Sequence, residues 1–259
     1  MSTSTVARPA PAPQSLRPQW MRSFDTTMGV CLYVSKWFLL IMVGIAVVAA
    51  LIMTRITTPE VSIVQFGQQA GIWFPFSLMI MCGVLTPTIV MHGITRRATS
   101  VGSVLTAVAM AALFTAAFAV FLVLERWIFE ALGWQAGLAS DPERLALGAL
   151  APHLPSLFLV FCAANISGLL VHTAYYRLGG LFGTAALPLT LAPVILVGAL
   201  GGRPNSPGRP WGPAPDSLPG NLAVDLGLWH PVIAIAIITL AAAAYLLLIR
   251  TLTLSPKES

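Results

Sequence analysis

Six long runs of apolar residues alternate with shorter polar segments along the chain. They cover residues 37–53, 73–91, 101–124, 154–174, 181–200 and 229–249. A bilayer core about 30 Å thick requires on the order of 20 apolar residues in each helix that crosses it. The pattern therefore predicts an all-α, polytopic membrane protein with six transmembrane helices, and it excludes a soluble domain.

A periodic pattern precedes the first of these runs. Within residues 19–36, apolar side chains recur at spacings of three to four, the period of an α-helix. These side chains are Trp20, Met21, Phe24, Met28, Cys31 and Leu32. Charged residues fall mostly between them, so the pattern predicts an interfacial amphipathic helix that lies in the inner surface of the membrane.

The polar segments define the rest of the organisation. Residues 1–18 are rich in Pro, Ala and Ser and have no apolar periodicity, so we expect a disordered tail. We expect residues 19–250 to form one six-helix transmembrane domain and residues 251–259 to form a cytoplasmic tail. Within that domain, residues 201–228 contain a stretch dense in Pro and Gly, which predicts an outer loop without long helices.

Basic residues are distributed unequally between the two sides of the predicted bundle. With the N-terminus placed inside, nine are inside and five outside: Arg8, Arg17, Arg22, Lys36, Arg96, Arg97, Arg177, Arg250 and Lys257, against Arg55, Arg126, Arg144, Arg203 and Arg209. Acids have the opposite bias, with two inside and seven outside. Because basic residues are retained in the cytoplasm during insertion, we expect both termini to be cytoplasmic.

Composition agrees with this class of protein. The chain is 57% hydrophobic and only 9% charged, which is typical of a membrane protein. Its net charge of +5 comes from basic residues that are scattered beside the spans. This distribution indicates anchoring at the surface of the lipid bilayer, so we expect no nucleic-acid partner.

Residues that carry chemistry are few. The three cysteines are too few for a disulfide framework, and we expect them to pack as small apolar residues. The four histidines lie two on each side, with no acid inside a span, which makes a poor metal site. Residues 165–168 read NISG, with Asn in place of the first glycine of the Gly-x-Ser-Gly turn that serine intramembrane proteases need. The nucleotide-binding loop G-x-x-x-x-G-K-[ST] does not occur in the sequence. We therefore expect no enzyme activity and no cofactor in this chain.

The interiors of the predicted spans are almost free of ionisable residues. Carriers and channels that use a proton or sodium gradient place Asp, Glu, Arg or His at membrane depth. We therefore do not expect this chain to couple to an ion gradient by itself. If it moves a substrate, the energy comes from another source.

Two predicted inner turns are the most informative polar segments. The first comprises His92, Gly93, Thr95, Arg96 and Arg97, and the second Tyr175, Tyr176 and Arg177. In the first, Gly93 is expected to interrupt a helix, and Thr95 or Ser100 to cap the next one. Its two arginines either anchor the chain by the positive-inside rule or form a docking element for a cytosolic partner.

These features together resemble a known family. Six spans, a preceding interfacial helix, a G-x-[ST]-R-R turn at 93–97 and a Y-Y-R-[FL]-G turn at 175–179 are similar to ABC-2-type permeases. These permeases are the membrane subunits of ATP-binding-cassette exporters, and the chain is most similar to small actinobacterial members. The Pro- and Gly-rich outer segment departs from the re-entrant outer helices that are frequent in the family.

The resemblance implies a multi-pass protein of the bacterial plasma membrane that exports an unidentified substrate. A cytosolic ATP-binding subunit would bind ATP and meet the 92–99 turn, and a second permease chain, identical or different, would complete the pathway. The alternative is a non-catalytic structural subunit of a multi-subunit membrane complex or enzyme. A third class, an enzyme acting on lipid, needs a polar constellation that the sequence lacks.

Overall fold

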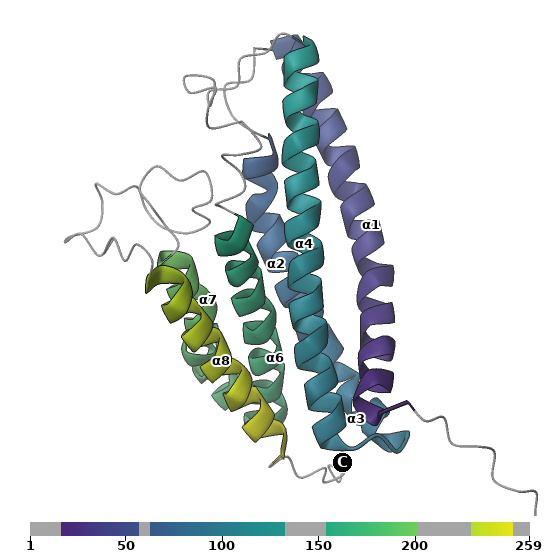
Figure 1. Ribbon diagram of the computed structural model, residues 1–259, viewed down its shortest axis with the longest axis vertical. Coiled ribbons are helices and arrows are strands. Elements are labelled where there is room, and N and C mark those ends of the chain that lie inside the picture. The colour runs from purple at the N-terminus through teal and green to yellow at the C-terminus, as the bar shows by residue number, and fades with distance from the viewer. Residues whose placement is uncertain (1–16, 57–62, 133–153, 201–228, 251–259) are drawn as a thin grey trace, which may run out of the picture.

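The described residues form a bundle of helices and contain no strand (Figure 1). The computed structural model describes residues 17–56, 63–132, 154–200 and 229–250. The predicted outer loop 201–228, the tail 251–259 and residues 1–16 of the predicted disordered tail lie outside this description. The helices are α1 (Gln19–Ile56), α2 (Ile63–Val84), α3 (Thr86–Met91), α4 (Arg96–Leu132), α6 (Leu154–Ala185), α7 (Leu187–Leu200) and α8 (Trp229–Arg250).

The all-α prediction is confirmed for these residues, but the count of six spans is not. Five of the described helices are long and apolar enough to cross a membrane. The predicted span 181–200 is divided between the end of α6 and α7, which has only 14 residues. Gly179 interrupts α6 with a φ of 76°. Pro188 lacks the amide hydrogen that would bond to the Thr184 carbonyl, so a second break follows.

The predicted interfacial helix 19–36 is not a separate element. α1 continues through it into the first apolar run as one helix of 38 residues, and no proline interrupts this stretch. Its buried side chains in this region form a row of small residues at every fourth position, and only Cys31 belongs to the apolar set named above: Ser23, Thr27, Cys31 and Ser35. Small side chains allow helices to approach closely, which explains why this face turns inward.

Two other predicted spans have different bounds in the structure. The run 73–91 is divided into α2 and α3 at Leu85, because Pro87 has no amide hydrogen to continue the helical bonds. The run 101–124 lies within α4, which is 37 residues long and ends at Leu132. Residues 125–132, which follow this predicted span, are therefore helical as well.

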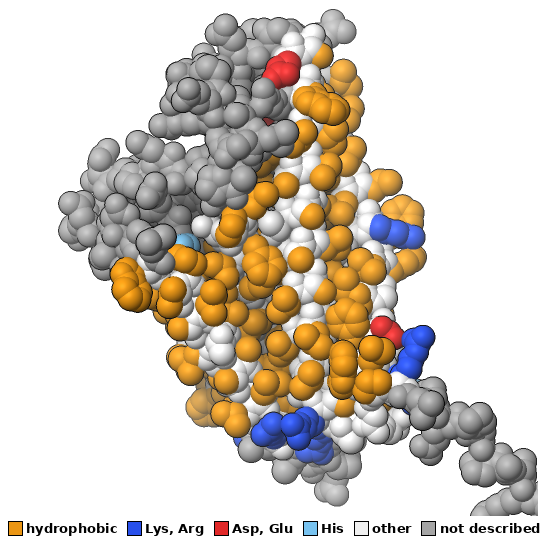
Figure 2. All heavy atoms as spheres, viewed as in Figure 1, with side chains coloured by type: hydrophobic (Ala, Val, Ile, Leu, Met, Phe, Trp, Pro, Cys, Tyr) orange, Lys and Arg blue, Asp and Glu red, His pale blue; other side chains and the backbone are white. Residues whose placement is uncertain are grey.

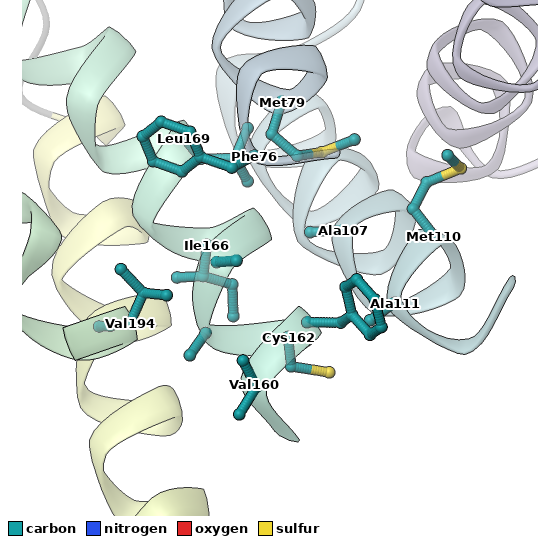
Figure 3. Packing of buried hydrophobic residues seen from close by; sticks show 14 of the residues in the cluster. Phe76, Met79, Ala107, Met110, Ala111, Val160, Cys162, Ile166, Leu169 and Val194 are labelled. Atoms are coloured by element: carbon teal, nitrogen blue, oxygen red, sulfur yellow. The ribbon is translucent and has the colours of Figure 1, made fainter. Parts of the chain in front are cut away.

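α6 is the central helix of the bundle. In its most apolar stretch 78% of the residues are buried, compared with 6% in the corresponding stretch of α1. Figure 3 shows Phe76 and Met79 of α2, Ala107 of α4 and Val194 of α7 around Ile166 of α6. The bundle is therefore built around α6, whereas much of α1 faces outward.

Glycines set the closest helix contact, between α2 and α6. A Cβ atom added to Gly168 would collide with the carbonyl oxygen of Phe76 and lie 3.0 Å from the Cβ of Met79. A Cβ atom added to Gly83 would overlap the ring of His172. The two helices are therefore packed almost backbone to backbone along this seam.

Four phenylalanines lie at the same height in four helices. The rings of Phe38 (α1) and Phe74 (α2) are stacked, with centroids 3.7 Å apart. The ring of Phe114 (α4) is 5.9 Å from that of Phe74 and 6.1 Å from that of Phe161 (α6). We call these four rings the aromatic layer. They show which positions of α1, α2, α4 and α6 lie at the same height in the bundle.

Charge separates along the bundle axis. The first residues of α1 and the last residues of α8 lie at the same end, drawn at the bottom of Figure 1. Figure 2 shows most of the visible Lys and Arg side chains towards this end, with one acidic side chain beside them and another near the opposite end. α4 begins with Arg96 and Arg97, and Glu125, Arg126 and Glu130 lie near its other end. We call the end that holds Arg96 and Arg97 the basic end.

Candidate functional site

The first predicted site is the turn between α3 and α4 at the basic end. The chain leaves α3 through His92 and Gly93, and the φ of Gly93 is 85°, a left-handed conformation that glycine adopts readily. The amides of His92 and Gly93 donate to the carbonyl oxygens of Thr88 and Val90. The prediction that Gly93 interrupts the helix is confirmed.

Thr95 caps the start of α4. Its hydroxyl oxygen accepts a hydrogen bond from the Ala98 amide at 3.3 Å, and its carbonyl accepts one from the Thr99 amide at 2.9 Å. Ser100, the other predicted cap, lies inside α4 and donates to the Arg97 carbonyl at 3.0 Å. The cap fixes the direction in which α4 leaves the turn.

The start of α1 supports this turn from the side. The Thr95 amide donates to the side-chain oxygen of Gln19 at 3.2 Å, and the Ser23 hydroxyl lies 3.5 Å from the Thr99 carbonyl oxygen. A Cβ atom on Gly102 would lie 2.8 Å from the Ser23 hydroxyl, so the two helices touch closely here. α1, the turn and the start of α4 therefore form one packed unit.

The outward side of the turn is basic and accessible. His92, Gly93, Thr95 and Arg97 are exposed, and Arg96 is half-buried. We call these five residues the α3–α4 turn surface. Arg96 and Arg97 occupy the first positions of α4, where the positive end of the helix dipole disfavours cations. A carboxylate placed against this surface would relieve that repulsion.

The second predicted turn lies at the end of the long part of α6. Tyr175, Tyr176 and Arg177 are all exposed there. The Tyr175 hydroxyl is 3.0 Å from the Thr184 hydroxyl, and a Cβ atom on Gly183 would lie 2.8 Å from the Tyr175 ring. The residues that follow Gly179 therefore fold back beside Tyr175 and hold this turn in place.

Buried polar groups on α6 serve helix packing. The Asn165 side chain donates to the Ala107 carbonyl oxygen at 2.8 Å and so links α6 to α4. The Ser167 hydroxyl is buried and has no hydrogen-bond partner among the described residues. The His172 ring stacks on Tyr176 at a centroid distance of 6.0 Å.

In the described part of the chain, no three His, Cys, Asp or Glu residues are grouped to hold a metal ion.

No protein-family model, curated protein or solved structure matches this chain. The geometry of the basic end therefore carries the functional argument.

The structure also contains features that the sequence pattern did not reveal. Gln19 and Thr95 are 76 residues apart, and no local signal predicts their contact. The sulfur atoms of Cys31 and Cys82 lie 3.0 Å apart, which links α1 to α2.

Lys36, which was assigned to the inner surface, lies within α1 because this helix continues without a break through residues 19–36. Its side chain is exposed, with the ammonium nitrogen 4.7 Å from the centre of the Tyr33 ring.

Proposed function

We propose that this chain is the membrane-spanning permease subunit of an ABC-2-type exporter in the bacterial plasma membrane. A separate cytosolic subunit binds and hydrolyses ATP, and a second permease chain completes the pathway for a substrate that is not yet identified. The observation that best supports this proposal is the α3–α4 turn surface, which is basic, exposed and held rigidly by Thr95 and Gln19.

The turn surface has the properties that a coupling element requires. It joins α2 and α3 to α4, so a displacement of the turn is passed directly to helices that extend through the bundle. Arg97 is exposed and offers several donors to carboxylates or to the last carbonyl groups of a helix in the partner. The contacts of Gln19 and Ser23 with this unit transmit the same displacement to α1 as well.

The proposed topology predicts the result of reporter fusions. A fluorescent protein fused after Lys257 should fold and fluoresce, because the positive-inside bias places this tail in the cytoplasm. Alkaline phosphatase inserted within residues 201–228 should be active, because that segment lies outside. Alkaline phosphatase fused after Lys257 should be inactive, because that position is expected to be in the cytoplasm. The reverse pattern at both positions would refute the proposed orientation.

Removal of the two turn arginines tests the coupling role. We expect Arg96→Ala combined with Arg97→Ala to lower co-purification with the ATPase subunit, and substrate-stimulated ATP hydrolysis, by about tenfold. Loss of one charge-assisted hydrogen bond at the low end of the usual range, about 1.5 kcal/mol, accounts for an effect of this size. Pull-down yield and ATPase rate in membrane vesicles are the measurements.

The matched control removes two basic residues elsewhere on the predicted inner side. Arg250→Ala combined with Lys257→Ala lowers the positive-inside bias equally but leaves the turn surface intact. Reporter fusions in both double variants verify that topology is unchanged. If the turn variant assembles and stimulates ATP hydrolysis like the control, the docking role is wrong. The two arginines then act only as membrane anchors.

A further inference from the structure

α3 is a short link between two parts of the bundle that are firmly held. On one side, α2 lies against α6 so closely that a Cβ atom on Gly83 would overlap the His172 ring. On the other side, Thr95 caps α4, and its amide donates to the Gln19 side chain of α1. Between these two parts, α3 has only six residues, or about 9 Å of helix, at the basic end (Figure 1).

The chain lacks a helical hydrogen bond where α2 meets α3. Pro87 has no amide hydrogen, so the Gly83 carbonyl oxygen cannot accept the bond that a continuous helix would form there. The Leu85 amide donates instead to the Cys82 carbonyl oxygen, three residues earlier, at 3.1 Å. Tight turns of this kind within a helical stretch often mark a hinge. We call residues 85–87 the α2–α3 junction.

The other end of α3 turns at a glycine. The Gly93 amide donates to the Val90 carbonyl oxygen at 3.0 Å, and the φ of Gly93 is 85°. A Cβ atom on Gly93 would meet nothing within 4 Å, so no described neighbour packs against this side of the residue. α3 therefore has a position at each end where the direction of the backbone can change.

Packing also changes at the α2–α3 junction. Before the junction, α2 buries five residues between positions 76 and 83: Phe76, Leu78, Met79, Cys82 and Gly83. After the junction, α3 buries Ile89 alone among its six residues. A helical segment with few buried contacts shifts at a lower cost in free energy than a densely packed one. α3 is therefore the more easily displaced of the two helices.

We propose that α3 is a hinged link that changes its angle to α2 when the α3–α4 turn surface is displaced. The inference rests on the proposed function, in which a cytosolic ATPase displaces that surface. α4 and α1 follow the turn, because Thr95 and Gln19 hold them to it, whereas α2 stays against α6. Bending at the α2–α3 junction allows these two parts to move relative to each other.

Pro75 shows that a proline alone does not produce such a link. α2 continues through Pro75 without a break, although the Gly71 carbonyl oxygen loses its helical bond there as well. Pro75 is buried beside Phe76, whose carbonyl oxygen lies at the contact with α6. Dense packing therefore holds α2 together at Pro75, and Pro75→Ala is the matched control for Pro87→Ala.

Distances between spin labels test the hinge in the full chain, reconstituted in lipid nanodiscs. One pair is Met91→Cys on α3 with Pro155→Cys on α6, and the reference pair is Met81→Cys on α2 with Pro155→Cys. All three positions are exposed, and the native cysteines are buried. Labelling of the chain without added cysteines verifies that the native ones do not react. We expect a wider distribution of distances for the α3 pair than for the reference pair, and equal widths would overturn the proposal.

Substitution of Pro87 tests where the link bends. Pro87→Ala supplies the missing amide, and one helical hydrogen bond shifts the equilibrium towards the straight form by about fivefold, or about 1 kcal/mol. We expect this variant to narrow the distribution of the α3 pair, whereas Pro75→Ala leaves it unchanged. An unchanged width in Pro87→Ala, or equal narrowing in both variants, would show that the hinge does not lie at this junction.

ATP hydrolysis by the complex purified from the native membrane tests the role of the link in coupling. We expect Pro87→Ala to keep co-purification with the ATPase, because the turn surface is intact, but to lower the rate of hydrolysis by about fivefold. A normal rate in a variant with the narrowed distribution would overturn the proposal. Absence of an ATPase from preparations of the unsubstituted chain contradicts the proposed function, whereas the label distances test the hinge independently of it.

Discussion

Replacement of Gly168 by leucine is expected to destabilise the packed bundle strongly. The first atom of the new side chain would collide with the backbone carbonyl of Phe76 and press on Met79. A backbone oxygen has no rotamer by which it can move away, so α2 and α6 must separate. Overpacking costs about 1–3 kcal/mol at ordinary core sites, and we expect at least about 3 kcal/mol here.

Thermal unfolding in detergent and gel filtration measure this effect. A loss of about 3 kcal/mol lowers the melting temperature of a protein of this size by about 10 °C. Gly44→Leu is the matched control, because a Cβ atom at Gly44 meets nothing within 4 Å on the exposed side of α1. Equal melting temperatures for the two variants would show that the α2–α6 seam is wrong.

Mild oxidation is expected to join α1 to α2 through Cys31 and Cys82. Their sulfur atoms are 3.0 Å apart, and a disulfide requires about 2.05 Å, so a movement of about 1 Å closes the bond. With dioxygen and copper phenanthroline, the two thiols lose two electrons and two protons, and the oxygen is reduced to water. The third cysteine, Cys162, lies on α6 and stays free.

Thiol labelling after denaturation gives the readout. We expect three labelled cysteines before oxidation and one afterwards. Cys82→Ser should keep both of its remaining thiols under the same treatment. Three thiols in the oxidised wild-type chain would show that this part of α1 does not lie beside α2.

Apolar run length predicted most of the helices, because the bilayer sets a minimum length for each. The length of an apolar run does not show where a helix continues beyond that run. In α1 the continuation contains small polar residues such as Ser23 and Thr27, which are buried because their small size allows helices to approach closely. Periodicity in residues 19–36 correctly identified a helix, but it could not show that this helix continues into the apolar run as α1. It also gave no sign that Ser23 and Thr27 are buried against the bundle.

The basic end was easier to predict than the membrane-facing surface. Gly93 and Thr95 act through the backbone of neighbouring residues, so their local sequence indicates the turn. The positions of Gln19 and Lys36 depend on how α1 packs on α4, which is a contact between distant segments. Residue types and their spacing do not predict a contact between segments that are far apart in the sequence.

The unequal lengths of the helices have a consequence for the lipid around the protein. α7, with 14 residues, is about 21 Å long, whereas the apolar run 101–124 within α4 is about 36 Å long. A hydrocarbon layer of uniform thickness cannot match both, and each ångström of mismatch costs a fraction of a kcal/mol. If both helices face lipid, the hydrocarbon layer must therefore be thinner beside α7 than beside α4.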